Sequence, residues 1–371
     1  MRDQAAARRL DFCAQDGGRR PQLGARRHRG IMRTSAWFAG MLALWAGVAS
    51  ADGLDITLLD FSDLNGWDQD DHGDALSVFQ STCRDMRAPH WPTLCTLSEQ
   101  VTDARDFFEV FFVPVLMEDG EAPLFTGYFE PELRGAMAPD DQYRYPVYAV
   151  PPDLPDEPWF TRRELEENGI LADRGLELAW VDDPVELFFL QVQGSGRIRL
   201  AEGGTLRVGF GAANRQPYSS VGLELVNRGI YEPHEVSADV IRSWVRRNPE
   251  EGQELLWTNQ SYVFFREVNE VPPSRGPLGA MNRSITTGRS VAVDPSIVPL
   301  GAPVWIEKDG AEPMRRLMVA QDTGSAIKGA QRADIFYGTG RAAGLAAGRV
   351  RDGGRMVVLL PIQTAHALCQ R

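Results

Sequence analysis

Two aspartates, Asp322 and Asp334, lie within or beside short apolar segments that are bounded by glycines. Residues 317–319 are apolar and predict a buried strand, and residues 323–325 predict a sharp turn directly after it. Residues 333–337 predict a second short strand or turn. Two carboxyl groups presented at the ends of neighbouring strands can share one cleft. Such a cleft can perform proton transfer.

A third aspartate, Asp294, ends an apolar segment in the same way. From Ser284 to the end of the chain, the sequence predicts alternating short strands and turns. The strands are expected at residues 290–294, 303–306, 317–319 and 356–360. The three aspartates therefore fall in one C-terminal module of about 90 residues, a size consistent with a small β-barrel.

Three kinds of protein could use these acids. The tripeptide Asp322-Thr323-Gly324 is typical of aspartic proteases, but those enzymes need two such aspartates and the chain has no second copy. A glycoside-cleaving enzyme fits better, because it needs a cleft with a few carboxyl groups and many hydrogen-bonding side chains. The third alternative is a module that only binds sugar, which would need the cleft but would not use the acids for catalysis. Spacing alone does not separate these last two alternatives.

Composition and charge set the broad class. The chain has 371 residues, 43% hydrophobic and 24% charged, which is ordinary for a globular protein of about two domains. Its formal net charge is −12, and this argues against binding to nucleic acid. Residues 1–51 are rich in arginine and predict an N-terminal extension followed by a cleaved signal peptide. That peptide starts at Met32 or Met1, has an apolar stretch at residues 36–48 and ends in Ala-Ser-Ala.

The cysteines and histidines predict neither a lipid anchor nor a metal site. No cysteine follows the expected cleavage site, so we expect export to the periplasm without a lipid-anchor cysteine. Cys83 and Cys95 are spaced to bridge a short loop, although two free thiols fit the sequence equally well. The chain has 5 histidines and no cluster with metal-ligand spacing, so we expect no metal and no cofactor.

Hydrophobic periodicity predicts the secondary structure of the rest of the chain. Helices are expected at residues 71–86, 98–112, 161–168, 219–227 and 237–247, with Pro249 as a stop. Strands are expected at residues 124–134, 145–148, 187–193, 197–200, 205–210 and 259–266, with a linker at 151–157. In the segment 187–193, alternation would place Phe188 and Leu190 on one face and Gln191 and Gln193 on the other.

Several longer segments resemble one known family. They are Phe-Thr-Gly-Tyr-Phe-Glu-Pro at 125–131, Phe-Leu-Gln-Val-Gln-Gly-Ser-Gly-Arg at 189–197, Ala-Asn-Arg-Gln-Pro-Tyr at 213–218, Asn-Gln-Ser-Tyr-Val-Phe-Phe-Arg at 259–266, Arg-Ser-Val-Ala-Val-Asp at 289–294, and Ala-Gln-Asp-Thr-Gly-Ser-Ala-Ile-Lys-Gly at 320–329, followed by Arg-Ala-Asp at 332–334. They resemble the membrane-bound lytic murein transglycosylase A family from about Gly66 to Pro361. The C-terminal part resembles the domain named for its three aspartates.

The resemblance implies a fold that is mainly β with a few helices. We expect a double-psi β-barrel from residues 52–150 and 264–371, with the three-aspartate module at about 283–361. A smaller β-domain, residues 151–263, would be inserted, leaving a groove between the two. The expected ligand is a peptidoglycan glycan strand, bound by a monomer. Partners in wall remodelling are not predicted by the sequence.

The implied reaction cuts the β-1,4 bond between N-acetylmuramic acid and N-acetylglucosamine without water. It leaves a 1,6-anhydro end. The resemblance assigns the acid and base to Asp334, whose pKa must be raised by burial and by a nearby carboxylate. Asp322 and Asp294 would set the field around it, unless they only cap turns. Lys328 would neutralise developing charge, unless it is simply solvated.

The remaining expected contacts to substrate also come from the resemblance. They are Tyr128, Gln191, Gln193, Gly194, Ser195, Asn214, Asn259, Thr323 and Gly324. Among them, Gln193 stands out because Gln-Gly-Ser-Gly-Arg is a motif of the family. Amide and hydroxyl groups of this kind suit the acetamido and hydroxyl groups of a glycan.

Overall fold

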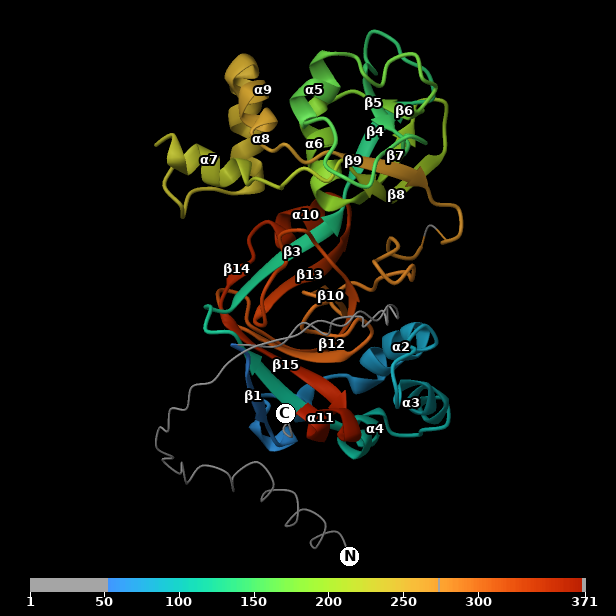
Figure 1. Ribbon diagram of the computed structural model, residues 1–371, viewed down its shortest axis with the longest axis vertical. Helices are drawn as coiled ribbons and strands as arrows, with labels where there is room; N and C mark the ends of the chain where they lie inside the picture. The colour runs from blue at the N-terminus through green and yellow to red at the C-terminus, as the bar shows by residue number, and fades with distance from the viewer. Residues whose placement is uncertain (1–52, 273, 369–371) are drawn as a thin grey trace, which may run out of the picture.

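The computed structural model describes residues 53–272 and 274–368. The expected extension and signal peptide at residues 1–51 lie outside the described residues. The fold is mixed α/β, with two sheets of nine and six strands. Figure 1 shows the larger sheet in the lower half of the molecule and the smaller one in the upper half.

The larger sheet combines the first strands of the chain with all the C-terminal ones. In spatial order its strands are β1 (Asp55–Leu58), β2 (Phe112–Glu118), β15 (Gly354–Pro361), β11 (Pro303–Lys308), β12 (Met314–Asp322), β10 (Ser290–Ala292), β13 (Arg332–Thr339), β3 (Leu124–Glu130) and β14 (Arg351–Asp352). Two of its pairs, β10 with β12 and β13 with β3, are parallel. The expected strands of the C-terminal module are therefore present, and most are longer than predicted.

The smaller sheet is formed by the middle of the chain. In spatial order its strands are β5 (Tyr145–Tyr148), β6 (Glu177–Val181), β4 (Glu132–Ala136), β7 (Ser195–Leu200), β8 (Thr205–Ala213) and β9 (Val263–Glu267). Its core contains apolar side chains from all six strands and Leu190 from a covering helix. A turn at residues 201–204 joins β7 to β8, as the strands expected at 197–200 and 205–210 require.

Helices cover both sheets. The larger sheet packs against α2 (His72–Cys83), α4 (Ala104–Phe111), α10 (Gly340–Ala347) and α11 (Ile362–Leu368), and α3 (Trp91–Ser98) packs on α2. The upper half holds α5 (Arg162–Glu167), α6 (Pro184–Gln193), α7 (Val221–Asn227), α8 (Ala238–Arg247) and α9 (Pro249–Trp257). Short 3-10 turns occupy Phe61–Asp63 and Trp67–Gln69. Within residues 53–272 and 274–368, no helix has the length and apolar character needed to cross a bilayer.

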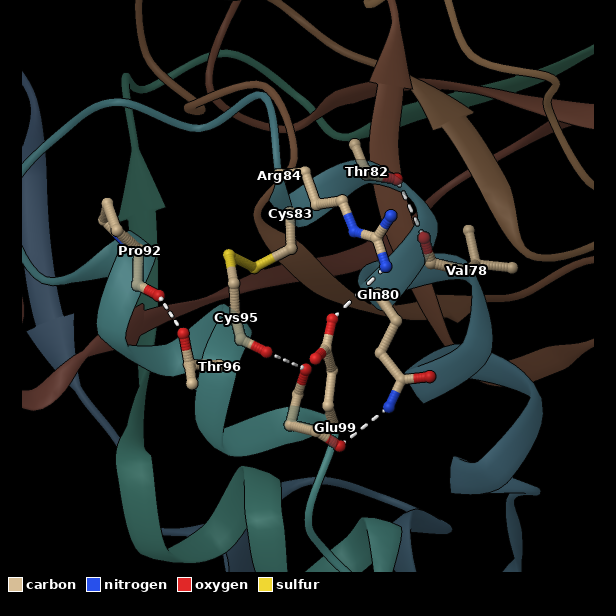
Figure 2. The surroundings of a disulfide bond; sticks show 10 residues. Val78, Gln80, Thr82, Cys83, Arg84, Pro92, Cys95, Thr96 and Glu99 are labelled. Atoms are coloured by element: carbon tan, nitrogen blue, oxygen red, sulfur yellow. Dashed lines mark hydrogen bonds and ion pairs between the residues drawn. A yellow bond between two sulfur atoms is a disulfide. The ribbon is translucent and has the colours of Figure 1, made fainter.

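A disulfide joins Cys83 at the end of α2 to Cys95 in α3, with Cα atoms 5.5 Å apart. Figure 2 shows the bridge and two contacts beside it, the ion pair of Arg84 with Glu99 and the hydrogen bond from Gln80 to the backbone of α3. Next to it, Phe79 packs among the aromatic rings of α3, α4 and β2. The structure thus selects the bridged form of the two that the sequence allowed.

A buried ion cluster lies where the chain passes from one sheet to the other. Strand β3 ends at Glu130 and β4 begins at Glu132, so a single residue separates the two sheets. The Glu130 side chain is fully buried, and its carboxylate accepts hydrogen bonds from Arg197, from Arg207 at 2.7 and 3.1 Å, and from Thr339 at 2.7 Å. The cluster ties strands of both sheets to the crossing point.

The strand predicted at residues 187–193 is wrong, because this segment is part of helix α6. Asp183 caps the helix by accepting hydrogen bonds from the backbone of Val185 and Glu186, and Pro184 occupies its first position. Gly194 ends it with a left-handed φ of 76°, so it is a helix cap and not a strand turn. Short apolar runs are ambiguous between helix and strand, and here the caps decide.

Other helices were also missed. The helix predicted to stop before Pro249 does end at Arg247, but Pro249 also begins a further helix, α9, that was not predicted. The segment between the cysteines, expected to be a loop, contains α3. Helices α10 and α11 interrupt the expected alternation of strands and turns after Ser284. The helix predicted at residues 98–112 is shorter, because α4 covers only Ala104–Phe111 and β2 begins at the next residue.

Candidate functional site

A groove of about 770 Å³ lies between the two sheets and is lined by side chains from both. The wall from the larger sheet carries Tyr128, Ala292, Asp322, Thr323, Gly324, Ile327, Arg332 and Asp334. The opposite wall carries Gln191, Val192, Gln193, Gly194, Ser195, Phe210, Tyr218, Asn259 and Arg266. The groove therefore brings together residues that are about 200 positions apart in the sequence.

Sheet register places Asp322 and Asp334 on one face. Ala292 on β10 pairs with Asp322 on one side and with Asp334 on the other. Directly paired residues project from the same face of a sheet, and neighbouring strands lie about 4.8 Å apart, so the Cα atoms of the two aspartates are about 10 Å apart. Ala292 between them is small and buried, which leaves room for both carboxyl groups over the middle strand.

The carboxyl group of Asp334 is mostly enclosed and has one hydrogen-bond donor. Thr126 on β3 pairs with Asp334 in the parallel ladder, and its Oγ1 donates to Asp334 Oδ1 at 2.7 Å. Burial raises the pKa of Asp334 to about 6, although Thr126 and Arg332 act in the opposite direction. The charge of Asp322 adds a smaller increase to the pKa. Near pH 6 the group can therefore both release and accept a proton.

Asp322 has more partners. Its Oδ2 accepts a hydrogen bond from the Tyr128 hydroxyl at 2.8 Å, and its Oδ1 accepts from the backbone of Ala280 and Thr323. Burial raises the pKa of Asp322 to about 6 against these three donors. The preceding residue, Gln321, is fully buried and donates to Thr82 on α2, which anchors this end of β12 to the helix.

Asp294 lies apart from the residues that line the groove. Its carboxylate accepts from the backbone and hydroxyl of Ser296 and from the backbone of Gly329. Burial alone would raise its pKa, but these hydrogen bonds and Lys328 hold the pKa below its ordinary value. Lys328 is exposed and lies 3.7 Å from this carboxylate. Both residues therefore meet at the base of the loop that carries Thr323 and Gly324.

The wall opposite the aspartates is formed by the end of α6 and the start of β7. Gln193 lies here, and its Oε1 accepts from the backbone of Phe129 at 3.0 Å. Gln191 is buried and accepts from Arg162, a buried cation between the rings of Phe188 and Tyr262. Gly194 and Ser195 complete this part of the wall.

The two expected asparagines differ in position. Asn259 lines the groove, and its Oδ1 accepts from the backbone of Ser219 and Ser261. Asn214 is fully buried and is not among the lining residues. Its side chain donates to two backbone carbonyls and accepts from the backbone of Tyr262.

Several residues of the groove were missed from the sequence. Thr126 touches Asp334, and the strand period of two places Arg332 on the face of Asp334, so alternation alone would have found it. Phe210 and Tyr218 add partly exposed rings to the opposite wall. Their exposure depends on tertiary packing and has no local signal. Over residues 53–272 and 274–368, no group of three histidine, cysteine or acidic side chains is arranged to hold a metal ion.

Comparison with known proteins identifies the family. A model of the MltA specific insert domain matches residues 124–266, and a model of the 3D domain matches residues 289–360. Membrane-bound lytic murein transglycosylase A of Vibrio cholerae is 35% identical over 245 residues, which cover 63% of this chain and 64% of the relative. The match thus spans slightly less than two thirds of that curated relative.

Solved structures extend the match. The membrane-bound lytic murein transglycosylase of Agrobacterium tumefaciens is 34% identical, with a TM-score of 0.74 over 84% of this chain and 99% of that one. Escherichia coli MltA with bound chitohexaose is 27% identical, with a TM-score of 0.65 over 78% of this chain and 90% of that one. The identity over nearly the whole Agrobacterium protein and the two matched domains show that this chain belongs to the membrane-bound lytic murein transglycosylase A family.

Proposed function

We propose that the protein is a peptidoglycan lytic transglycosylase. It cleaves the β-1,4 bond between N-acetylmuramic acid and N-acetylglucosamine and leaves a 1,6-anhydromuramic end. The observation that carries this proposal is the enclosed carboxyl group of Asp334, whose pKa is raised to about 6 inside a groove of about 770 Å³. Membership of the family and the chitohexaose bound to the Escherichia coli relative support it.

One carboxyl group is enough for both proton transfers. Protonated Asp334 donates its proton to the glycosidic oxygen as the bond from that oxygen to C1 of muramic acid breaks. The resulting carboxylate takes the proton from the C6 hydroxyl, and O6 bonds to C1. Asp334 ends protonated, no water is consumed, and the enzyme is ready for another cycle. A pKa near the working pH favours both steps.

The neighbouring acids have different roles in this proposal. Asp322 fixes the Tyr128 hydroxyl on the substrate side and disfavours the ionised form of Asp334 through its charge. Asp294 is ionised and acts on the reaction only by holding, with Lys328, the loop that presents Thr323 and Gly324. The amides of Gln191, Gln193 and Asn259 and the hydroxyl of Ser195 bind the glycan, whereas Asn214 supports them through the backbone.

The fold and location are part of the proposal. The larger sheet would close into a double-psi β-barrel built from residues 52–150 and 264–371, with the 3D domain within it. Residues 151–263 would form the inserted domain. The protein would work as a monomer in the periplasm after removal of residues 1–51. The net charge of −12 argues against binding to nucleic acid.

Digestion of purified peptidoglycan tests the reaction. The products are separated, weighed by mass spectrometry and assayed for reducing ends. Non-reducing muramic products lighter by one water support the lyase, and reducing muramic ends would show a hydrolase. Substitution Asp334→Asn is expected to stop release while glycan binding persists. Binding without any release by the unaltered protein would leave only a binding module.

A further inference from the structure

Arg332 lies in the groove beside Asp334. It precedes the aspartate by two residues on β13, so both side chains project from the same face of the sheet. Its Nη1 donates to the backbone carbonyls of Leu124 at 3.1 Å and Ala333 at 2.7 Å. These two contacts hold the guanidinium at one nitrogen. Nε and Nη2 remain for another acceptor.

A second arginine lies on the same face. Arg351 on β14 pairs with Thr126 on β3, and Thr126 pairs on its other side with Asp334. The three side chains therefore form a row across the sheet, with the Cα of Arg351 about 10 Å from that of Asp334. Burial lowers the pKa of Arg332, and the charge of Arg351 lowers it further, against the attraction of Asp334.

Neither arginine has a carboxylate within ion-pair distance among residues 53–272 and 274–368. The other two arginines that line the groove, Arg162 and Arg266, each have a carboxylate partner. Arg332 is attracted by the charge of Asp334 beyond ion-pair distance, so a carboxylate in direct contact would stabilise this half-buried cation. A structural role explains the two backbone contacts of Arg332. It does not explain why one cation lies two residues from the reacting acid on β13 while a second lies in the row of side chains that crosses the sheet at that acid.

We propose that Arg332 and Arg351 receive a carboxylate carried by the muramic acid units of the glycan strand, and that they select such strands over neutral chito-oligosaccharides. This inference rests on the proposed function. A guanidinium suits the task because its planar donors match the two oxygens of a carboxylate. The carboxylate has two chemical sources: the lactyl group of a strand without peptides, or the stem peptide of a strand that carries them.

The test measures affinity for three glycans of similar length by calorimetry. They are chitohexaose, peptide-free strands with lactyl carboxylates, and peptide-bearing strands. All variants are prepared on the Asp334→Asn background so that the ligand stays intact. A charge-assisted hydrogen bond predicts a carboxylate strand to bind roughly tenfold more tightly than chitohexaose. Arg351→Gln and Arg332→Gln should each reduce the ratio of the affinity for a carboxylate strand to the affinity for chitohexaose. Added salt should reduce this affinity ratio only in the parent, the protein that carries Asp334→Asn alone.

Arg87→Gln is the matched control. Arg87 is another exposed arginine that lies outside the groove, and its substitution removes the same charge. Its ratio should equal that of the parent. If peptide-free strands already bind more tightly than chitohexaose, the bound carboxylate is that of the lactyl group. If only peptide-bearing strands bind more tightly, the bound carboxylate is that of the stem peptide. Equal affinities for all three glycans, or a preference that survives both substitutions, would overturn the inference. Arg351 is exposed on an edge strand, so its variant tests the idea even if Arg332→Gln fails to fold.

The two proposals fail in different ways. If the unaltered protein releases anhydro products but does not distinguish the three glycans, only the anion site is wrong. If it releases nothing from peptidoglycan yet prefers carboxylate strands, the catalytic proposal fails and the anion site stands.

Discussion

Replacing Thr126 with valine would remove one hydroxyl group from the groove and leave almost the same volume. The lost interaction is the 2.7 Å hydrogen bond to Asp334 Oδ1, which lowers the pKa of that carboxyl group. A hydrogen bond to a charged group contributes about 1.5 kcal/mol at the low end of its range, and one pKa unit corresponds to about 1.4 kcal/mol. We therefore expect the pKa of Asp334 to rise by about one unit from its present value of about 6.

The assay is the pH dependence of kcat/KM on soluble glycan strands between about pH 5 and pH 8. Asp334 must be protonated to start the reaction, so the rate should fall as pH rises through its pKa. In Thr126→Val the falling limb should move to higher pH by about one unit. Thr126→Ser keeps the hydroxyl and should leave the limb in place. An unshifted limb in the valine variant would show that another group controls the reaction.

Three further predictions concern stability. Glu130→Gln should destabilise the protein by about 3 kcal/mol or more, since the buried Arg207 and the partly buried Arg197 both lose their counter-charge. Glu132→Gln, which alters an exposed pair, should change the free energy of unfolding by less than about 1 kcal/mol. Loss of the disulfide in Cys83→Ser/Cys95→Ser should cost about 3 kcal/mol and lower the melting temperature, whereas an equal melting temperature under reducing and oxidising conditions would contradict its stabilising role. The folded pKa of Asp322, about 6, lies above the ordinary aspartate value of 3.8, so its contribution to stability is complete below about pH 3.8 and is lost as pH rises to about 6. Asp322→Asn should therefore flatten the pH dependence of the melting temperature in that window, and an unchanged slope would mean that the carboxyl group is not enclosed in solution.

The aspartate-bearing strands could be predicted from the sequence because their signals are local. Residues 317–319 are continuously apolar, and in the structure they are fully buried in β12. The helix expected at residues 161–168 is likewise present as α5, and both hydrogen bonds of a capping box between Thr161 and Glu164 mark its start. Such elements are specified by a few adjacent residues, so neighbouring parts of the chain need not be known.

The environment of the acids could not be predicted in the same way. Thr126 meets Asp334 only because β3 and β13 run parallel, a pairing between residues 208 positions apart. The helix at 184–193 was mistaken for a strand because its apolar run is short, and its caps at Asp183 and Gly194 were overlooked. Asn214 belongs to a family motif, but the hydrogen-bonding groups of its side chain are all occupied by backbone partners. Only the tertiary packing shows this.

The crossing at Glu130 also bears on how a polymer can enter. At this crossing, the charge of Glu130 is held between arginines from one sheet and a threonine from the other. We expect this crossing to resist hinge motion. The two walls of the groove should therefore stay fixed relative to each other when a ligand binds. A glycan strand would then enter the groove along its length. The fixed shape of the groove, and not a closing movement of its walls, would present successive sugar units to Asp334.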